Sequence, residues 1–94
     1  MEIGELRNGM SGVSVSGRIT EISERRTVNT RYGKRDVADA TLEDESGSIK
    51  LVLWGNQIDK VSVGDTINVK GAYVTEFRNE LQLNVPRSGS IEKV

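Results

Sequence analysis

The sequence predicts an all-β fold: a closed barrel of five antiparallel strands, with a short helix between the third and fourth strands. Apolar residues recur at every second position in five short segments, which is the period of a half-buried strand. The chain has 10 Gly and 1 Pro, so turns are frequent and the strands between them are rarely interrupted. Its 94 residues suffice for one modest core, and we expect one domain over residues 1–94.

The N-terminal segment, residues 1–12, is expected to cover one end of the core. Ile3, Leu6 and Met10 are separated by three and four residues, which is the spacing of neighbouring side chains on a helix. Glycines at three positions of the segment argue against a longer helix. We therefore expect an irregular cover that contains a single helical turn.

The first strand begins at Val13, where apolar and polar residues start to alternate. Ile22 breaks this alternation, which predicts a bulge near Thr20–Glu21. Such a bend allows one strand to take part in both sides of a small barrel. The polar and basic segment that follows, residues 25–35, is expected to be a long hairpin loop.

The second and third strands are expected at residues 36–43 and 48–54, joined by a turn at residues 44–47. In the third strand the apolar residues at odd positions point inward, so Lys50 and Trp54 point outward with the other even-numbered residues. An exposed Leu51 with a buried Lys50 would overturn this register.

The short helix is expected within residues 55–63, and the fourth strand follows it. A bulge at Gly71 would shift the buried parity of that strand, Arg78-Asn79 would form a turn, and Pro86 would end the fifth strand. Five strands with a helix after the third is the order of an OB-fold, and an SH3-like barrel, which also has five strands, is the nearest alternative. The residues predicted inside the barrel are Val15, Ile19, Ala40, Leu42, Ile49, Leu51, Leu53, Ile67, Val69, Leu81 and Leu83.

The composition excludes several classes of site. The chain has no Cys and no His, which excludes disulfides, thiolate metal sites and imidazole catalysis. Asp44 and Glu45 are placed in a tight turn, where Asp is favoured for its turn geometry rather than for catalysis. We therefore expect no enzyme, no metal and no other cofactor. No apolar run approaches a membrane span and no signal peptide is visible, so we expect a cytoplasmic, nucleoid-associated protein, or a nuclear one in a eukaryote.

The charges are unevenly distributed although the formal net charge is only −1. Residues 17–35 carry six basic and two acidic side chains, whereas residues 36–47 carry five acidic and no basic ones. The basic side chains concentrate in the first hairpin loop, which flanks the ligand groove of an OB-fold. They form either a solvated loop or a site for phosphate groups.

Three of the four aromatic residues fall on the outward side of the predicted strands. Trp54 has the parity opposite to its apolar neighbours, and Tyr73 and Phe77 follow the Gly71 bulge on the outer parity. An exposed aromatic cluster usually marks a binding surface, and bases of single-stranded nucleic acid stack on such rings. The alternative for Trp54 is that it caps one end of the core.

Aromatic rings beside basic loops predict binding of single-stranded nucleic acid, because a double helix hides its base faces. Two other interpretations stay open. The aromatic residues would form a subunit interface in an OB-fold that serves protein–protein assembly. The same chemistry also suits RNA, including tRNA, because discrimination at the 2′-hydroxyl depends on a few placed polar groups.

With these residues placed, the sequence resembles the archaeal single-stranded-DNA-binding proteins of the simple, one-OB type, which are related to the OB domains of replication protein A. The resemblance covers about residues 3–86 and is most specific at residues 42–55, Leu-Glu-Asp-Glu-Ser-Gly-Ser-Ile-Lys-Leu-Val-Leu-Trp-Gly. There an acidic-Gly turn leads into a strand that ends in Trp. Residues 63–69 resemble the entry to the fourth strand, and residues 72–84 resemble the stretch after it.

The resemblance implies a non-enzymatic protein that binds single-stranded DNA in replication, recombination and repair. The family's stacking positions fall on Trp54, Tyr73 and Phe77, and Tyr73 stands where close relatives often have Trp. The family's first-loop positions fall on Arg26, Val28, Arg31, Lys34 and Arg35. The predicted interface is completed by residues on the outward side of the third and fourth strands and in the turn beside Phe77, namely Lys50, Thr75 and Arg78.

The resemblance also bears on partners. Family members usually carry a Gly-rich or acidic tail, and this chain stops at Val94. We therefore expect either a domain separated from its tail or one OB domain of a longer subunit like that of replication protein A. Single-stranded DNA is the expected partner, RNA is the alternative, and replication or repair proteins are expected further partners of a monomer.

Overall fold

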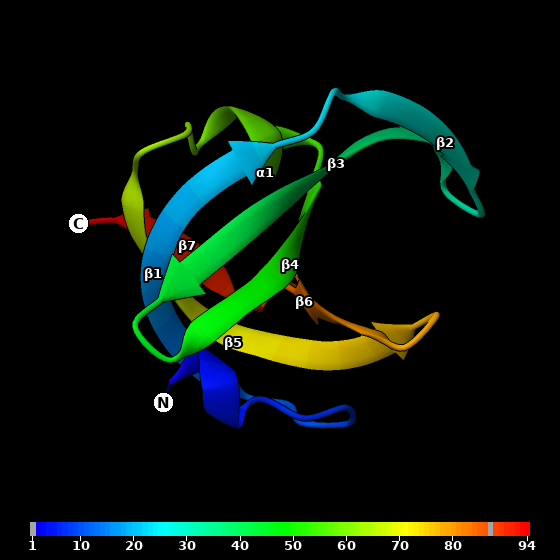
Figure 1. The fold of residues 1–94 in the computed structure, drawn as a ribbon. Helices are drawn as coiled ribbons and strands as arrows, with labels where there is room; N and C mark the ends of the chain where they lie inside the picture. Colours follow the sequence, from blue (N-terminus) through cyan, green and yellow to red (C-terminus); the bar gives the residue numbers. More distant parts are fainter. Residues whose placement is uncertain (1, 87) are drawn as a thin grey trace.

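The computed structural model describes residues 2–86 and 88–94 and contains a sheet that closes on itself (Figure 1). Around the ring the strands follow one another in the order β1, β3, β4, β6 and β5, and β5 pairs again with β1. Along the chain, the short helix α1 (Asn56–Asp59) lies between β4 and β5, the third and fourth ring strands in sequence order. The predicted all-β OB-fold barrel is therefore confirmed. The ring strands are β1 (Val13–Ile22), β3 (Gly33–Asp44), β4 (Gly47–Trp54), β5 (Thr66–Phe77) and β6 (Glu80–Asn84).

One pairing of the ring departs from the antiparallel prediction. Strands β1–β3, β1–β5, β3–β4 and β5–β6 pair antiparallel, but β4 and β6 pair parallel. The chain leaves β4 through α1, runs along β5, and turns back in a tight hairpin into β6. That return brings β6 beside β4 in the same direction, which is the kind of long crossover that parallel strands require.

Both predicted bulges are present. The register between β1 and β3 shifts between Ile19 and Glu21, so the first half of β1 pairs with β5 and the second half with β3. The register between β1 and β5 shifts where Gly71 adopts a φ of +70°, a conformation that glycine tolerates without strain. Beyond it Ala72 and Val74 are the buried residues of β5, as expected.

The segment predicted as a long loop, residues 25–35, is instead mostly a β-hairpin. Strand β2 (Arg26–Thr30) pairs with the first residues of β3, and only Arg31 and Tyr32 form the turn. β3 therefore starts at Gly33 rather than at residue 36. Both sides of this ribbon lie mostly in solvent, so its residues lack the apolar alternation that reveals a strand. In Figure 1 the β2–β3 hairpin and the β5–β6 hairpin extend from the barrel on the same side.

A seventh strand, β7 (Ser90–Lys93), was not predicted and pairs antiparallel with β5. Its one apolar residue, Ile91, is partly buried against the core. A single apolar residue cannot produce the alternating pattern that predicts a strand. In the part of the chain that the structure describes, no helix is long and apolar enough to cross a membrane.

The interior matches the predicted register. Leu51 is fully buried and Lys50 is half-buried, so β4 faces the core as expected. Every residue predicted inside is buried except Leu81, which is only partly buried. Val61 and Val85 join the core without having been in the predicted set.

The N-terminal cover is confirmed and is tied to the turn between β3 and β4. The helical turn η1 (Ile3–Glu5) places Ile3 in the core. The Asp44 carboxylate accepts hydrogen bonds from the Ile3 N–H at 2.9 Å and the Ser46 N–H at 2.7 Å, while the Gly4 N–H donates to Ser46 Oγ at 2.8 Å. The bond from Ile3, followed by those from the Ser46 side chain and the turn backbone, lowers the pKa of Asp44 below its usual value of 3.8.

Candidate nucleic-acid interface

Strand register brings the outward residues of four strands onto one surface, which we call the outer face. Residues directly opposite each other on paired strands point to the same side of a sheet. Asp39, Val52, Asn84 and Tyr73 form one row across β3, β4, β6 and β5. The remaining members of the outer face are Val37 and Thr41 on β3, Lys50 and Trp54 on β4, Thr75 and Phe77 on β5, and Glu80 and Gln82 on β6. Val37 and Val52 have this parity but are themselves buried.

The register places the three predicted stacking aromatics on this one face. Trp54 is half-buried, Tyr73 is 40% exposed and Phe77 is 58% exposed. Trp54 lies at the end of β4, opposite Val37, and Phe77 lies at the far end of β5, opposite Glu80. Trp54 is not part of the core cluster, and its side chain is partly exposed.

A cleft of about 480 Å³, which we call the Trp54 pocket, opens at the Trp54 end of the outer face. Trp54 and Tyr73 both line it, together with Arg35 and Asn84. Tyr32, from the turn of the β2–β3 hairpin, completes a third aromatic side. A pocket walled by aromatic rings and opened to solvent suits flat, π-stacking ligands such as bases.

The backbone around Trp54 is held by a side-chain amide. Gln57 in α1 accepts a hydrogen bond from the Trp54 N–H at 3.0 Å and donates to the Val85 carbonyl at 3.1 Å. The Gly55 N–H donates to the Asp36 carbonyl at 2.9 Å, and Gly55 has a φ of +52°, which glycine tolerates best. These bonds join β4, α1, β3 and the chain just after β6, so the backbone that carries Trp54 is held in place.

The Arg35 guanidinium lies over the Trp54 ring, 5.8 Å from its centroid. A cation at this distance from a ring face is attracted to it, by about 0.5–1 kcal/mol at an exposed site. The contact holds a positive charge at the rim of the pocket. It also leaves the guanidinium near any phosphate that connects two stacked bases.

The β2–β3 hairpin divides its predicted contact residues between two sides. Arg35 pairs directly with Val28, and Arg26 pairs with Val37, so these residues lie on the side of the outer face. Lys34 pairs with Asn29 and lies on the opposite side of the ribbon. Arg31 is in the turn. The structure thus brings Arg26, Val28 and Arg35 together with the aromatics and separates Lys34 from them.

The other end of the outer face is the β5–β6 hairpin. Its turn consists of Arg78 and Asn79, whose φ values of +53° and +66° match the tight turns typical of two-residue hairpins. The Arg78 guanidinium lies 5.1 Å from the centroid of the Phe77 ring. The predicted residue Thr75 lies between this turn and Tyr73, and its hydroxyl accepts a hydrogen bond from Asn84.

Two of the predicted cations are already paired with carboxylates. Arg26 lies 3.4 Å from Asp39, and Lys50 lies 3.3 Å from Glu80. Within residues 2–86 and 88–94, no ion pair involves Arg31, Lys34, Arg35 or Arg78. The available positive charge beside the outer face is therefore on the two hairpins and on Lys60, which lines the Trp54 pocket, and the middle of the outer face is close to neutral.

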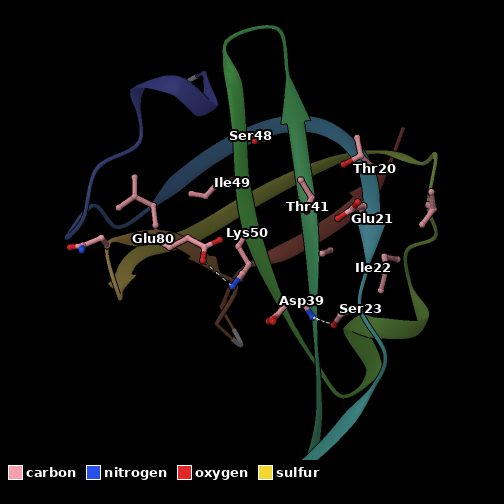
Figure 2. Close-up of a pocket in the computed structure, with 14 residues that line it drawn as sticks. Thr20, Glu21, Ile22, Ser23, Asp39, Thr41, Ser48, Ile49, Lys50 and Glu80 are labelled. Carbon is pink, nitrogen blue, oxygen red and sulfur yellow. Dashed lines mark hydrogen bonds and ion pairs between the residues drawn. The ribbon is translucent and has the colours of Figure 1, made fainter.

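A second and larger groove, of about 900 Å³, borders the Lys50 end of the outer face (Figure 2). Figure 2 shows Lys50 joined to Glu80 by their ion pair, with Thr41 and Asp39 along β3 and Glu21 on β1. No aromatic residue lines this groove among the described residues, and its carboxylates outnumber its one lysine. It is therefore a poorer site for bases and phosphates than the Trp54 pocket.

Sequence reasoning missed most of the pocket lining, including the two residues closest in kind to the predicted contacts, Tyr32 and Asn84. Tyr32 stands in the basic segment, and an aromatic residue in a turn is itself a signal of exposure. Asn84 alternates with Leu83 and Val85 in β6, so its outward direction was readable, but its position between Val52 and Tyr73 depends on the strand order. Among the described residues, no group of three or more His, Cys, Asp and Glu side chains could hold a metal ion.

Comparisons with known proteins agree with this geometry. The family model described as OB-fold nucleic acid binding domain matches residues 13–92. The chain is 34% identical over 93 residues to the single-stranded DNA binding protein Ssb of Saccharolobus solfataricus, covering 99% of this chain and 61% of that protein. It is 29% identical over 91 residues to replication factor A of Methanothermobacter thermautotrophicus, covering 96% of this chain and 12% of that protein.

The same architecture occurs in a solved structure, the OB domain of Ta0387 from Thermoplasma acidophilum. The two match with a TM-score of 0.87 and 26% sequence identity, over 100% of this chain and 85% of that one. The chain thus spans less than two thirds of the length of the two curated relatives and most of the length of an isolated OB domain.

Proposed function

This chain belongs to the family of OB-fold nucleic acid binding domains, and we propose that it binds single-stranded DNA without altering it chemically. The strand would lie along the outer face, with bases stacked on the aromatic rings and phosphates near the two hairpins. The names of the relatives, a single-stranded DNA binding protein and a replication factor A, support this ligand. They also support a role beside replication proteins, and we extend the proposal to recombination and repair.

The observation that carries the proposal is the shared outer face of Trp54, Tyr73 and Phe77. Rings that are half-buried or exposed in the free protein are costly unless they bind something apolar and flat. Each base stacked on such a ring contributes roughly 1–3 kcal/mol. Duplex DNA keeps its base faces covered, so it cannot use these rings.

The proposed roles follow from the positions of the side chains. The aromatic rings receive bases, Arg31 and Arg35 receive phosphates at one end, and Arg78 does so at the other. Val28 and Thr75 contribute contacts beside the rings. Arg26 and Lys50 would exchange a carboxylate for a phosphate when DNA binds. Lys34, on the far side of the hairpin, would attract the strand without contacting it.

The test is a titration of the protein with short oligonucleotides, followed through the fluorescence of Trp54, which is the only Trp. A single OB domain covers at least about 4 nucleotides, so lengths from three to twelve nucleotides bracket the expected site. We expect strong quenching by single-stranded DNA and little by the matched duplex.

Absence of quenching by any single strand, together with a mass that rises with protein concentration, would overturn the proposal. That result would favour protein assembly through the aromatic residues. Tighter binding of the matched RNA oligonucleotide would instead assign the face to RNA. In both cases the outer face would remain the surface in use, but its ligand would differ.

A further inference from the structure

Asn84 occupies the centre of the outer face and lines the Trp54 pocket. It lies between Val52 on β4 and Tyr73 on β5, so a base stacked on Tyr73 has Asn84 as its immediate neighbour. The side chain is half-buried, and its surroundings restrict its orientation. A polar side chain in this position contacts the edge of a base, whereas the aromatic rings contact its face.

The orientation of the Asn84 amide is set by two acceptors. Its Nδ2 donates to Thr75 Oγ1 at 3.0 Å and, in a longer contact of 3.5 Å, to the Gln82 carbonyl. A carbonyl oxygen can only accept a hydrogen bond, so the amine and not the oxygen of Asn84 must be on that side. Thr75 lies on the side of Asn84 that faces the β5–β6 turn. With the amide nitrogen on that side, the amide oxygen Oδ1 is on the side of the Trp54 pocket.

Oδ1 of Asn84 remains free to accept a hydrogen bond. None of the hydrogen bonds within the described residues ends on it. The same residues contain no buried side-chain nitrogen or oxygen that lacks a partner, so an unbonded Oδ1 is reachable by solvent. Two other amides line the pocket. Gln57 uses both its oxygen and its nitrogen on the backbone and has a structural role, and Asn56 is exposed on α1 rather than placed in the row of Val52 and Tyr73.

We propose that Asn84 reads the base in the Trp54 pocket and favours one with an exocyclic amine at its pairing edge, such as cytosine over uracil. The N4 amine of cytosine donates to Oδ1. Uracil carries a carbonyl oxygen at the same position, and two acceptors repel each other. This proposal rests on the proposed binding of single-stranded DNA and adds a base preference to it.

The test compares oligomers of deoxycytidine and deoxyuridine of equal length, which differ at the pairing edge and share the same backbone. A neutral hydrogen bond predicts that the wild-type protein binds the deoxycytidine oligomer about threefold to tenfold more tightly. Asn84→Ala removes the acceptor and should bring the ratio of the two affinities close to one.

Two further variants separate base reading from structural damage. Thr75→Val keeps the shape of the side chain but removes the acceptor for Nδ2, so the amide is free to rotate and the ratio should fall while Asn84 is still present. Asn68→Ala is the matched control, because Asn68 is also a half-buried strand Asn but bonds to Ser16 on the β1–β5 side, away from the outer face. It should leave the ratio unchanged.

Each outcome of these titrations supports or overturns the proposal for Asn84. A wild-type ratio near one, with both oligomers bound, overturns the proposal for Asn84 and leaves single-strand binding intact. A preference that survives Asn84→Ala and Thr75→Val also overturns it, because another group must then read the base. Failure of the wild type to bind either oligomer overturns both proposals together.

Discussion

The outer face carries an aromatic ring beside a guanidinium at each of its ends, and the two ends are built differently. At one end Arg35 lies over Trp54, and at the other Arg78 lies over Phe77, at similar distances of 5.8 and 5.1 Å. Trp54 is half-buried, however, and Gln57 joins its backbone to α1 and to the end of β6. Phe77 is 58% exposed and borders a two-residue turn.

The two ends offer the same kind of contact but differ in how the surrounding structure holds the aromatic residue. Both pairs offer a ring face and a positive charge, but Trp54 is half-buried and its backbone is bonded to neighbouring elements, so its side chain has less freedom than that of Phe77. A preorganised group loses less conformational freedom when its ligand binds, so more of the stacking energy is available for affinity. We therefore expect the Trp54 end to dominate binding, although the Phe77 ring is the more exposed.

The largest expected effect is that of Trp54→Ala. Loss of the supported ring should weaken single-stranded DNA binding by roughly 2–3 kcal/mol, the upper part of the range for base stacking. The free energy of unfolding should fall by less than the roughly 3–5 kcal/mol of a truncated core aromatic, because the ring is only half-buried. Fluorescence anisotropy of a labelled oligonucleotide and a thermal melt measure the two quantities. An unfolded variant, or one that binds as tightly as the parent, would contradict a stacking role for Trp54.

Phe77→Ala tests the unsupported end. We expect a smaller loss of binding, roughly 1 kcal/mol, and a change in the free energy of unfolding of no more than about 0.5 kcal/mol, as for other exposed positions. The same anisotropy and melting experiments apply. A loss of affinity equal to that of Trp54→Ala would show that support of the ring does not determine its contribution.

Arg35→Ala and Lys34→Ala compare adjacent cations on opposite sides of the β2–β3 hairpin. With three to five phosphate contacts, the logarithm of the wild-type affinity should fall against the logarithm of salt concentration with a slope of roughly −2 to −3.5. Arg35→Ala should make that slope shallower by about 0.7, the value for one phosphate contact on a single strand. Lys34→Ala should leave the slope nearly unchanged. Equal changes for both variants would mean that the hairpin acts through its total charge rather than through one side.

Glu80→Gln should increase affinity. Glu80 holds Lys50 at 3.3 Å in the free protein, so its neutralisation releases this lysine for a phosphate. We expect about twofold to threefold tighter binding, within the range of an exposed ion pair. Glu92→Gln is the matched control, because Glu92 pairs with Lys70 between β7 and β5, outside the outer face. If Glu80→Gln and Glu92→Gln increase the affinity for DNA equally, the change in net charge alone explains the increase.

Asp44→Asn should affect stability and leave binding unchanged, since Asp44 lies at the opposite end of the β3–β4 hairpin from Trp54. Its hydrogen bonds lower its pKa in the folded protein, so its contribution to stability is present above the usual value of 3.8 and is lost as pH falls through the lower folded pKa. Melts at pH 7 should show roughly 1 kcal/mol of destabilisation, as for loss of a capping carboxylate. The difference between variant and parent should shrink below pH 4. If the difference in stability between variant and parent did not depend on pH, the effect would come from the shape of the Asp44 side chain rather than from its charge.

The strands that the sequence predicted are those with one side in the core. Alternation of apolar and polar residues located β1 and β5 and both bulges, and in β4 the larger buried residues Ile49, Leu51 and Leu53 recur at every second position. The β2–β3 hairpin has no buried side along β2, and β7 has a single apolar residue, so neither could produce a pattern. The parallel pairing of β4 with β6 depends on which strands become neighbours, and alternation carries no information on that.

The site was predictable to a similar extent. Parity alone indicated that Trp54, Tyr73 and Phe77 point outward, and their exposure confirms it. Their individual contacts with DNA stay predictions. The separation of Lys34 from Arg35 follows from the unpredicted register of β2 with β3. Arg26 meets its partner Asp39 through the unpredicted β2–β3 hairpin, and Lys50 meets Glu80 through the unpredicted pairing of β4 with β6, so the nearly neutral middle of the face could not be foreseen.

The parallel pairing of β4 with β6 has a consequence for synthesis on the ribosome. The ring closes only when Gln82 meets Lys50 and Leu83 meets Leu51, and β6 is the last of the ring strands to be translated. Until then β1, β3 and β4 can pair, but Leu51 has no neighbour on its open side. A nascent chain therefore presents an unpaired, apolar strand edge, the kind of surface that aggregates before folding is complete. Folding of this domain is expected to be nearly all-or-none and to wait for the residues of β6 to leave the exit tunnel.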